Sequence, residues 1–187
     1  MNTQPQSESL RVAIPIVVVL LLVGLGIFFS RTASDQEPTP IKPDVTAGWK
    51  TSSDEVTGVS FRYPEQGFST SYITTVDWPP QVVLRDEPFV CTQAGSEIMQ
   101  NGKTEKYMIG DREYCVTKES EGAAGSIYTN YTYATAKGDK TLVMTFSLRA
   151  TQCGNYDQPK QSACENERAA FDPDAVSGEI MESVLVR

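Results

Sequence analysis

An uncharged apolar run near the start of the chain, from Val12 to Phe29, constrains the fold more than any other feature. It consists mainly of Val, Leu and Ile, with one proline and two glycines. As a helix rising 1.5 Å per residue it would extend roughly 27 Å, close to the hydrocarbon thickness of a bilayer. The run is apolar on every face, unlike a helix that packs one side on a soluble core. The sequence therefore predicts a transmembrane helix at residues 12–30, after a short cytoplasmic tail at residues 1–11.

A cleaved signal peptide is the main alternative for this segment. Such a peptide has a shorter apolar region that ends at a small-x-small site. Here Phe28 and Phe29 end the run, and a cut soon after them would put Arg31 three positions before the scissile bond, which fits poorly. No cysteine lies directly after the run, where a lipoprotein would carry its lipid. The pattern favours an uncleaved signal anchor, and the lipid bilayer is the predicted partner of residues 12–30.

The four cysteines, Cys91, Cys115, Cys153 and Cys164, indicate which side of the membrane the rest of the chain occupies. Their number is even, their spacings are long and no CxxC is present, which is typical of structural disulfides. Disulfides persist in oxidising compartments. The sequence therefore predicts a single-pass protein of the cell membrane with its C-terminal part extracytoplasmic.

Four cysteines allow three disulfide connectivities. We favour Cys91 with Cys115 and Cys153 with Cys164, because the second pair would close a polar loop, residues 154–163, that has little apolar content to order it. The chain-entropy model gives roughly 3 kcal/mol of stabilisation for each bridge.

The composition argues against several classes of function. Histidine is absent, which removes the usual zinc ligand and the usual general base of serine and cysteine hydrolases. The net charge of −8 and the lack of a Lys/Arg cluster disfavour nucleic-acid binding. The sequence predicts no enzyme activity, no metal and no cofactor.

Residues 31–48 form a Pro-rich linker, and residues 49–187 read as one extracytoplasmic disulfide-stabilised domain. Alternating apolar and polar residues predict most of its strands. Gly110-Asp111 predicts a hairpin turn of type II′, and Lys137-Gly138-Asp139 are the turn residues of a second hairpin. The expected strands are Val59–Tyr63, residues 69–74, 81–84, 107–109, 112–117, 127–136 and 140–149.

Two further segments carry their own local signals. The glycine-containing stretch from Glu119 to Ser126 reads as a mobile connection. Near the end of the chain, Asp172 suits a helix N-cap and Pro173 the first helical position, and Val176, Ile180 and Val184 recur every four residues. The expected fold class is α+β, an antiparallel β-sheet covered by a C-terminal helix, preceded by one N-terminal transmembrane helix.

The stretch Gly58-Val59-Ser60-Phe61-Arg62-Tyr63-Pro64 resembles the opening strand of PsbP-like domains. In that family an aromatic residue and a Tyr-Pro pair end the first strand, and a C-terminal helix packs on an antiparallel sheet. The segments 114–126 and 153–172 also resemble anchored proteins of candidate-phylum bacteria. The resemblance spans most of residues 49–187 and implies a fold, while it implies no catalytic residue and no role in photosynthesis.

No chemically reactive constellation stands out, so the candidate sites are binding sites. Tyr107, Tyr128, Tyr131 and Tyr133 could form an aromatic ligand-binding surface, although strand tyrosines more often pack half-buried. The acidic pairs lack the spacing of a calcium loop; they are Asp54/Glu55, Asp86/Glu87, Glu165/Glu167 and Asp172/Asp174.

The leading hypothesis is a non-enzymatic, membrane-anchored, extracytoplasmic binding or accessory module of the bacterial cell envelope, with an envelope protein or small ligand as partner. A pilin-like surface subunit is an alternative, although Pro15 lies inside the apolar run and the prepilin-type glycine is missing. A carboxylate-dependent extracytoplasmic hydrolase is the other alternative.

Overall fold

The computed structural model describes residues 46–95 and 102–187, which form antiparallel β-sheets with two α-helices. The predicted cytoplasmic tail, the transmembrane helix at residues 12–30 and residues 31–45 of the predicted linker lie outside the described residues. Within the described ranges, no helix has the length and apolar character needed to span a bilayer. The predicted α+β class is confirmed for this part of the chain.

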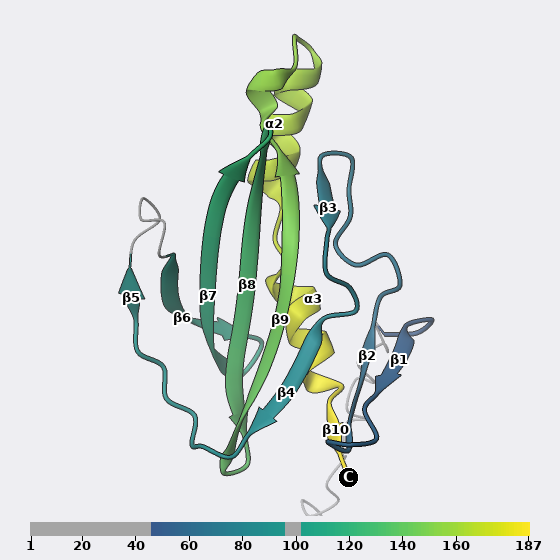
Figure 1. Ribbon diagram of the computed structural model, residues 1–187, viewed down its shortest axis with the longest axis vertical. Helices are drawn as coiled ribbons and strands as arrows, with labels where there is room; N and C mark the ends of the chain where they lie inside the picture. The colour runs from purple at the N-terminus through teal and green to yellow at the C-terminus, as the bar shows by residue number, and fades with distance from the viewer. Residues whose placement is uncertain (1–45, 96–101) are drawn as a thin grey trace, which may run out of the picture. The chain divides into compact units, whose positions relative to one another are not determined.

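The larger of two sheets has seven strands in the order β3-β9-β8-β7-β6-β5, and β4 also pairs with β9 (Figure 1). Every pairing is antiparallel. The three longest strands, β7, β8 and β9, form its centre. The bounds are β3 Ile73–Thr75, β4 Gln81–Arg85, β5 Ala94–Gly95, β6 Lys103–Ile109, β7 Arg112–Ala123, β8 Ser126–Lys137 and β9 Lys140–Thr151.

Two-residue turns join the long strands and fix their register. Gly110 between β6 and β7 has φ of 62° and Gly138 between β8 and β9 has φ of 65°. Asp111 is not among the described residues with positive φ, as expected for the predicted type II′ turn, in which only the first central residue has positive φ. Both predicted hairpins are therefore present.

The prediction of a mobile connection from Glu119 to Ser126 was wrong. β7 continues to Ala123, β8 begins at Ser126, and only two residues turn between them. Ala124 has φ of 48° and Gly125 has φ of 72°, and two successive positive φ angles are the mark of a type I′ hairpin turn. The polar residues around Gly122 thus belong to paired strands that are exposed on both faces at this end of β7, which composition alone cannot distinguish from a loop.

The strand predicted at residues 69–74 is shorter than expected, because a tight turn occupies its first half. The Thr70 N–H donates to the Ile73 carbonyl at 2.8 Å, and the Ile73 N–H donates to the Thr70 hydroxyl at 3.2 Å. Only the three residues of β3 then pair with β9.

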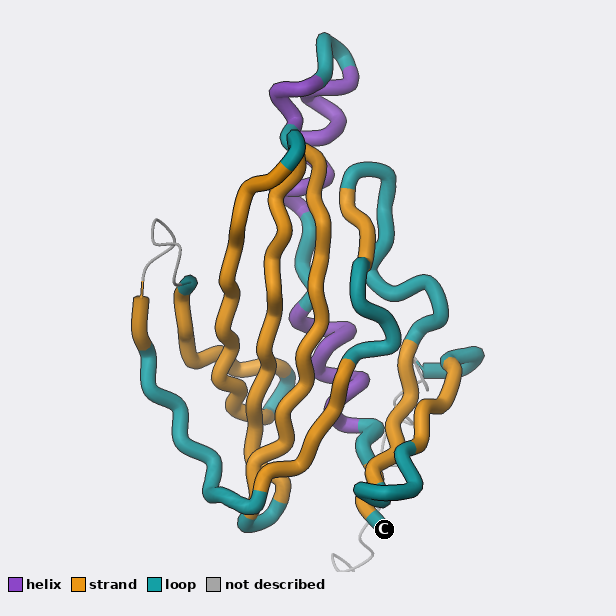
Figure 2. The backbone as a smooth tube through the Cα atoms, in the orientation of Figure 1, coloured by secondary structure: helices purple, strands orange, loops and turns teal. Residues whose placement is uncertain are grey.

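A helix that the sequence did not predict lies at the end of the large sheet. α2 spans Lys160–Ala170 and follows a short 3-10 helix, η1, at Cys153–Asn155 (Figure 2). Residues 154–163, predicted to be a polar loop, therefore include the first turn of α2. Its buried residue is Cys164, so the sequence offered no apolar stripe to detect. Both favoured disulfides, Cys91–Cys115 and Cys153–Cys164, are confirmed.

The predicted C-terminal helix is present as α3, Asp174–Glu182, one residue shorter at its start than expected and ending before Val184. The Asp172 carboxylate accepts a hydrogen bond from the Asp174 N–H at 2.9 Å, as a residue at a helix start does. The chain then continues as β10, Leu185–Val186, which pairs with β2 in a three-stranded sheet β1-β2-β10. In that sheet β1 is Lys50–Ser53 and β2 is the predicted strand Val59–Tyr63.

α3 contacts both β2 and β6, and it covers one face of the large sheet (Figure 1). The core between them is fully buried and includes Tyr133, Met144 and Phe146 from the sheet with Ile180 and Met181 from the helix. Because side chains alternate along a strand, the neighbouring residues of β7, β8 and β9 point to the other face. We call that side of the large sheet the open face.

Candidate functional site

The open face is built from cross-strand rows of polar side chains. One row runs Thr104, Thr117, Thr132 and Thr145 across β6, β7, β8 and β9, each residue paired directly with the next. The hydroxyls of Thr104 and Thr117 are 2.9 Å apart and hydrogen-bonded. Adjacent strands are spaced about 4.8 Å apart, so this row repeats a hydroxyl-bearing side chain at that interval.

Two further rows lie next to the threonine row, toward the β7–β8 turn. Glu119, Asn130 and Ser147 form one, and Glu121, Tyr128 and Arg149 form the other. Glu119, Glu121 and Asn130 are exposed, and Tyr128 is half-buried. This end of the open face therefore presents carboxylates, hydroxyls, an amide, one aromatic ring and the Arg149 guanidinium together.

A depression of about 640 Å³ lies over these rows, and we call it the open-face pocket. The segment after β3 forms one wall, where the Val76 N–H donates to the Ser147 carbonyl at 2.9 Å. The volume falls within the roughly 300–1,000 Å³ typical of small-ligand sites. The lining residues are Val76, Asp77, Glu119, Ser120, Glu121, Tyr128, Thr129, Asn130 and Ser147.

Some side chains of the open-face pocket are hydrogen-bonded to a neighbour, and others have no partner among the described residues. Ser147 donates to Asn130 Oδ1 at 3.4 Å. Ser120 and Thr129 alternate with the residues of the rows and so point to the other face of the sheet, where their hydroxyls share a hydrogen bond of 2.8 Å. In residues 46–95 and 102–187, the side chains of Glu119, Glu121 and Tyr128 make no hydrogen bond or ion pair with one another or with neighbours. Their polar atoms are therefore available to a ligand.

The four tyrosines predicted as a binding surface do not lie together. Tyr128 lines the open-face pocket, whereas Tyr131 and Tyr133 point to the helix-covered face, because odd and even residues of β8 face opposite ways. Tyr107 is on the helix-covered side as well, paired with Tyr114 of the core. The strand alternation in the sequence could have separated Tyr128 from the other three.

Tyr107 and Tyr131 both contact the ammonium group of Lys118. The Lys118 ammonium lies 5.4 Å from the centroid of the Tyr107 ring and 5.7 Å from that of Tyr131, which is cation–π distance. Glu105 accepts from the Tyr107 hydroxyl at 2.5 Å and pairs with Lys103 at 2.8 Å. The hydrogen bonds from Lys103 and Tyr107 lower the pKa of Glu105. These two rings are thus already occupied by a residue of the same chain.

Tyr133 has a structural role. Its side chain is fully buried, and its hydroxyl donates to Asp174 Oδ1 at 2.6 Å, which fixes the first turn of α3 on the sheet. Burial, together with the Asp174 carboxylate, raises the pKa of the Tyr133 phenol far above its usual value. Burial likewise raises the pKa of Tyr131. Neither phenol ionises near neutral pH.

The acidic pairs considered as cation or catalytic sites are used in separate local contacts. Asp54 accepts from the Val56 N–H at 2.8 Å, Asp86 pairs with Lys140, and Glu167 accepts from the Thr70 hydroxyl and the Tyr72 N–H. Residues 46–95 and 102–187 contain no group of three or more His, Cys, Asp or Glu side chains placed to hold a metal ion.

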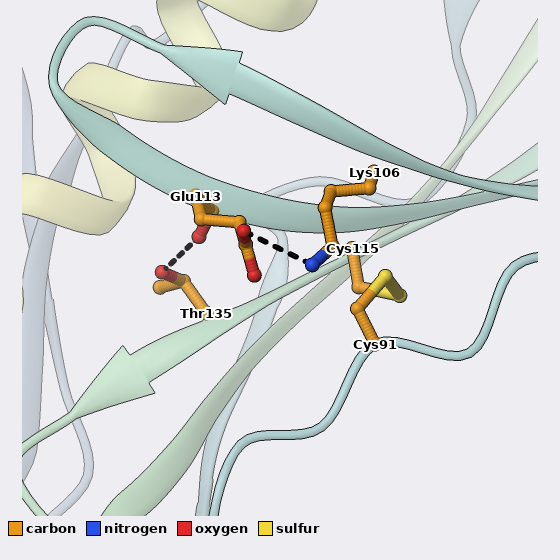
Figure 3. A network of polar contacts seen from close by, with 5 residues as sticks. All are labelled: Cys91, Lys106, Glu113, Cys115 and Thr135. Atoms are coloured by element: carbon orange, nitrogen blue, oxygen red, sulfur yellow. Dashed lines mark hydrogen bonds and ion pairs between the residues drawn. A yellow bond between two sulfur atoms is a disulfide. The ribbon is translucent and has the colours of Figure 1, made fainter.

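The other half of the open face is held by the Cys91–Cys115 bridge (Figure 3). Cys115 lies on β7 directly opposite Lys106 of β6, and the Lys106 ammonium pairs with Glu113 at 3.1 Å. The Thr135 hydroxyl of β8 donates to the Glu113 carbonyl at 2.7 Å. These contacts join three strands and fasten the segment before β5 to the sheet, leaving the end with the open-face pocket uncovered by that segment.

Comparisons with known proteins give no family for this chain. No family model matches, and no curated protein matches. A solved structure from Bacteroides thetaiotaomicron VPI-5482, determined at 1.50 Å resolution, is similar with a TM-score of 0.39 and 12% identity. The similarity covers 74% of this chain and 48% of that one. The resemblance to PsbP-like domains stays a prediction.

Proposed function

We propose that this chain is a non-enzymatic, membrane-anchored binding module of the cell envelope, whose extracytoplasmic domain binds its ligand on the open face of the large sheet. The observation that carries the proposal is the open-face pocket, in which Glu119, Glu121 and Tyr128 have no partner among the described residues. Concave sites with a few convergent polar groups are where proteins bind ligands. The described part of the chain contains no group of three or more His, Cys, Asp or Glu side chains placed to hold a metal ion.

The extracytoplasmic location is supported by the two disulfides and by the apolar run at residues 12–29. To test it, intact cells producing the full-length chain are treated with a membrane-impermeant maleimide. We expect no labelling until the cells are treated with a reductant, after which the cysteines of the exposed domain are labelled. Free thiols protected inside intact cells would contradict the proposal.

The binding role is tested with the full-length chain immobilised in a detergent whose head group is not a sugar. A cell-envelope fraction of the producing organism is passed over the wild type and over Tyr128→Ala and Asn130→Ala. Asn166→Ala, an exposed asparagine on α2, is the matched control. We expect a component to be retained by the wild type and the control and lost by both pocket variants. Equal retention by all four proteins, or chemical conversion of the retained component, would contradict a non-enzymatic role for the open-face pocket.

A further inference from the structure

The chemistry of the open-face pocket defines the class of ligand that suits it. Apart from Val76, every lining residue carries a polar side chain, although those of Ser120 and Thr129 point to the other face of the sheet. Carboxylates only accept hydrogen bonds, whereas the Asn130 amide and the hydroxyls both donate and accept. An apolar ligand would remove water from these groups and would offer no hydrogen bonds in place of those that water had made. The pocket therefore suits a ligand rich in groups that donate and accept together.

The charge of the pocket further restricts the chemical class of its ligand. Glu119, Glu121 and Asp77 all line it, and its lining residues include no Lys or Arg. Arg149, paired with Tyr128 in the next row, lies beside the pocket, where its Nε donates to Ser126 Oγ at 3.0 Å, so the carboxylates still outnumber the cation. An anionic ligand would have to approach these three carboxylates in a domain that belongs to a chain of net charge −8. Carboxylates readily accept hydrogen bonds from hydroxyl groups, and such bonds to a charged acceptor are stronger than neutral ones. The ligand is thus rich in hydroxyl groups and carries no negative charge.

The aromatic ring of Tyr128 and the threonine row indicate the shape of the ligand. Tyr128 lines the open-face pocket, and its half-buried ring offers an apolar surface beside its polar tip. Beyond the pocket, Thr117, Thr132 and Thr145 continue across the strands as a regular polar row. A sugar ring has an apolar C–H side and a hydroxyl rim, and a linear oligosaccharide repeats both along its length, so it matches a ring followed by a row of hydroxyls.

We propose that the open-face pocket binds an uncharged oligosaccharide, with one sugar ring against Tyr128, hydroxyl groups on Asn130 and the carboxylates, and further rings along the threonine row. This inference rests on the proposed function and names the ligand class for the same site. The alternative is a basic peptide, which would bind mainly through the carboxylates and would lose its affinity when they are neutralised.

The test is isothermal titration calorimetry on the full-length chain in a sugar-free detergent. The probes are cellotetraose and chitotetraose as uncharged oligosaccharides, tetragalacturonate as an anionic one, and tetralysine as a basic peptide. We expect at least one of the uncharged probes to bind, with affinity weakened about tenfold or more by Tyr128→Ala and by Asn130→Ala. Asn166→Ala and Thr51→Ala, exposed positions on α2 and β1, should change it by less than about twofold.

Charge-neutral variants separate a sugar site from a cation site. Glu119→Gln with Glu121→Gln removes the charge and keeps side chains that accept hydrogen bonds, so binding of the uncharged probe should weaken but persist, whereas binding of tetralysine should be lost. Thr132→Ala should weaken the tetrasaccharide more than the corresponding disaccharide, because only the longer probe reaches the threonine row. Unchanged circular dichroism spectra establish that each variant is folded.

The proposal is overturned if neither uncharged probe binds, or if tetragalacturonate binds as tightly as the uncharged probes. It is also overturned if tetralysine alone binds and loses its affinity in the glutamine variant. A bound oligosaccharide whose affinity is unchanged by Tyr128→Ala and Asn130→Ala would overturn it too. These results are distinct from failure of the proposed function. If the pocket variants abolish retention of an envelope component while no oligosaccharide binds, the binding role stands and the ligand class is wrong.

Discussion

Gly178 lies within α3, buried against β6, and its replacement by alanine tests how closely the helix packs on the sheet. A Cβ atom at this position would lie 2.7 Å from Cγ2 of Ile109. Carbon atoms in contact have their optimum separation at about 3.5–4.0 Å, so the added methyl group would overlap Ile109 by about 1 Å. Cγ2 is attached to a β-branched carbon whose χ1 is restricted, so it has little freedom to rotate away.

Two opposing terms decide the sign of the effect of Gly178→Ala. At an exposed helical site, alanine stabilises relative to glycine by about 1 kcal/mol. Overpacking in a core costs about 1–3 kcal/mol. We therefore expect Gly178→Ala to lower the free energy of unfolding by about 1 kcal/mol, whereas helix propensity alone would raise it. In an Ile109→Ala background Cγ2 is gone, and Gly178→Ala should instead stabilise by about 1 kcal/mol.

The assay is urea unfolding of the full-length chain under oxidising conditions, followed by the fluorescence of Trp49 and Trp78, which pack against the core. Ala175→Gly, at an exposed position of α3, measures the propensity term in the same helix and should lower the free energy of unfolding by about 1 kcal/mol in both backgrounds. If Gly178→Ala stabilises the wild type, or if its effect is the same with and without Ile109, the packing argument is refuted.

Three further predictions concern stability. Replacing Cys153 and Cys164 together by serine should lower the free energy of unfolding by about 3 kcal/mol, and an unchanged urea midpoint would argue against the entropic account. Tyr133→Phe removes the buried hydrogen bond to Asp174 and should cost about 1–2 kcal/mol in the same assay; a neutral result would mean that the bond has no net value. For Glu167, burial opposes the negative charge, but hydrogen bonds led by that from the Thr70 hydroxyl outweigh it and hold the pKa of the carboxyl below 4.5. The contribution of Glu167 to the free energy of unfolding is therefore present above pH 4.5 and lost as pH falls through the lowered folded-state pKa. Glu167→Gln should make the free energy of unfolding depend less on pH in this range. Parallel curves for the wild type and the variant would contradict this account.

The parts of the fold that the sequence predicted are those with local signals. The alternation in β9 buries Leu142, Met144, Phe146 and Leu148 on one face, and a positive φ at Gly138 serves the hairpin before it. The disulfide pairing was favoured because Cys153 and Cys164 would close a polar segment with little apolar content, and that pairing is present. By contrast, α2 buries Cys164 and shows no apolar stripe, and the two residues of β10 form a strand only because β2 lies beside them. Such elements depend on long-range contacts that no local pattern encodes.

The candidate site was missed because the tyrosines were considered by type and not by the face that each occupies. Tyr128 and Tyr131 are three residues apart in one strand, so they point to opposite faces of the sheet. Applying the two-residue period to β7, β8 and β9 together would have brought Glu119, Asn130 and Ser147 into one row. The sequence could have predicted that row once the three strands were aligned through their turns.

The core and the open-face pocket both depend on the same alignment of β7, β8 and β9. A shift of β8 by a single residue would move Tyr133 out of the core and Asn130 out of the pocket at the same time. That register is set by the two-residue turn at Ala124-Gly125, where both φ angles are positive. Gly125→Val should therefore disturb the pocket and the core together, because a β-branched residue tolerates positive φ poorly. A ligand on the open face would stabilise the same strand alignment that buries the core, so binding and unfolding are thermodynamically linked through β7 and β8.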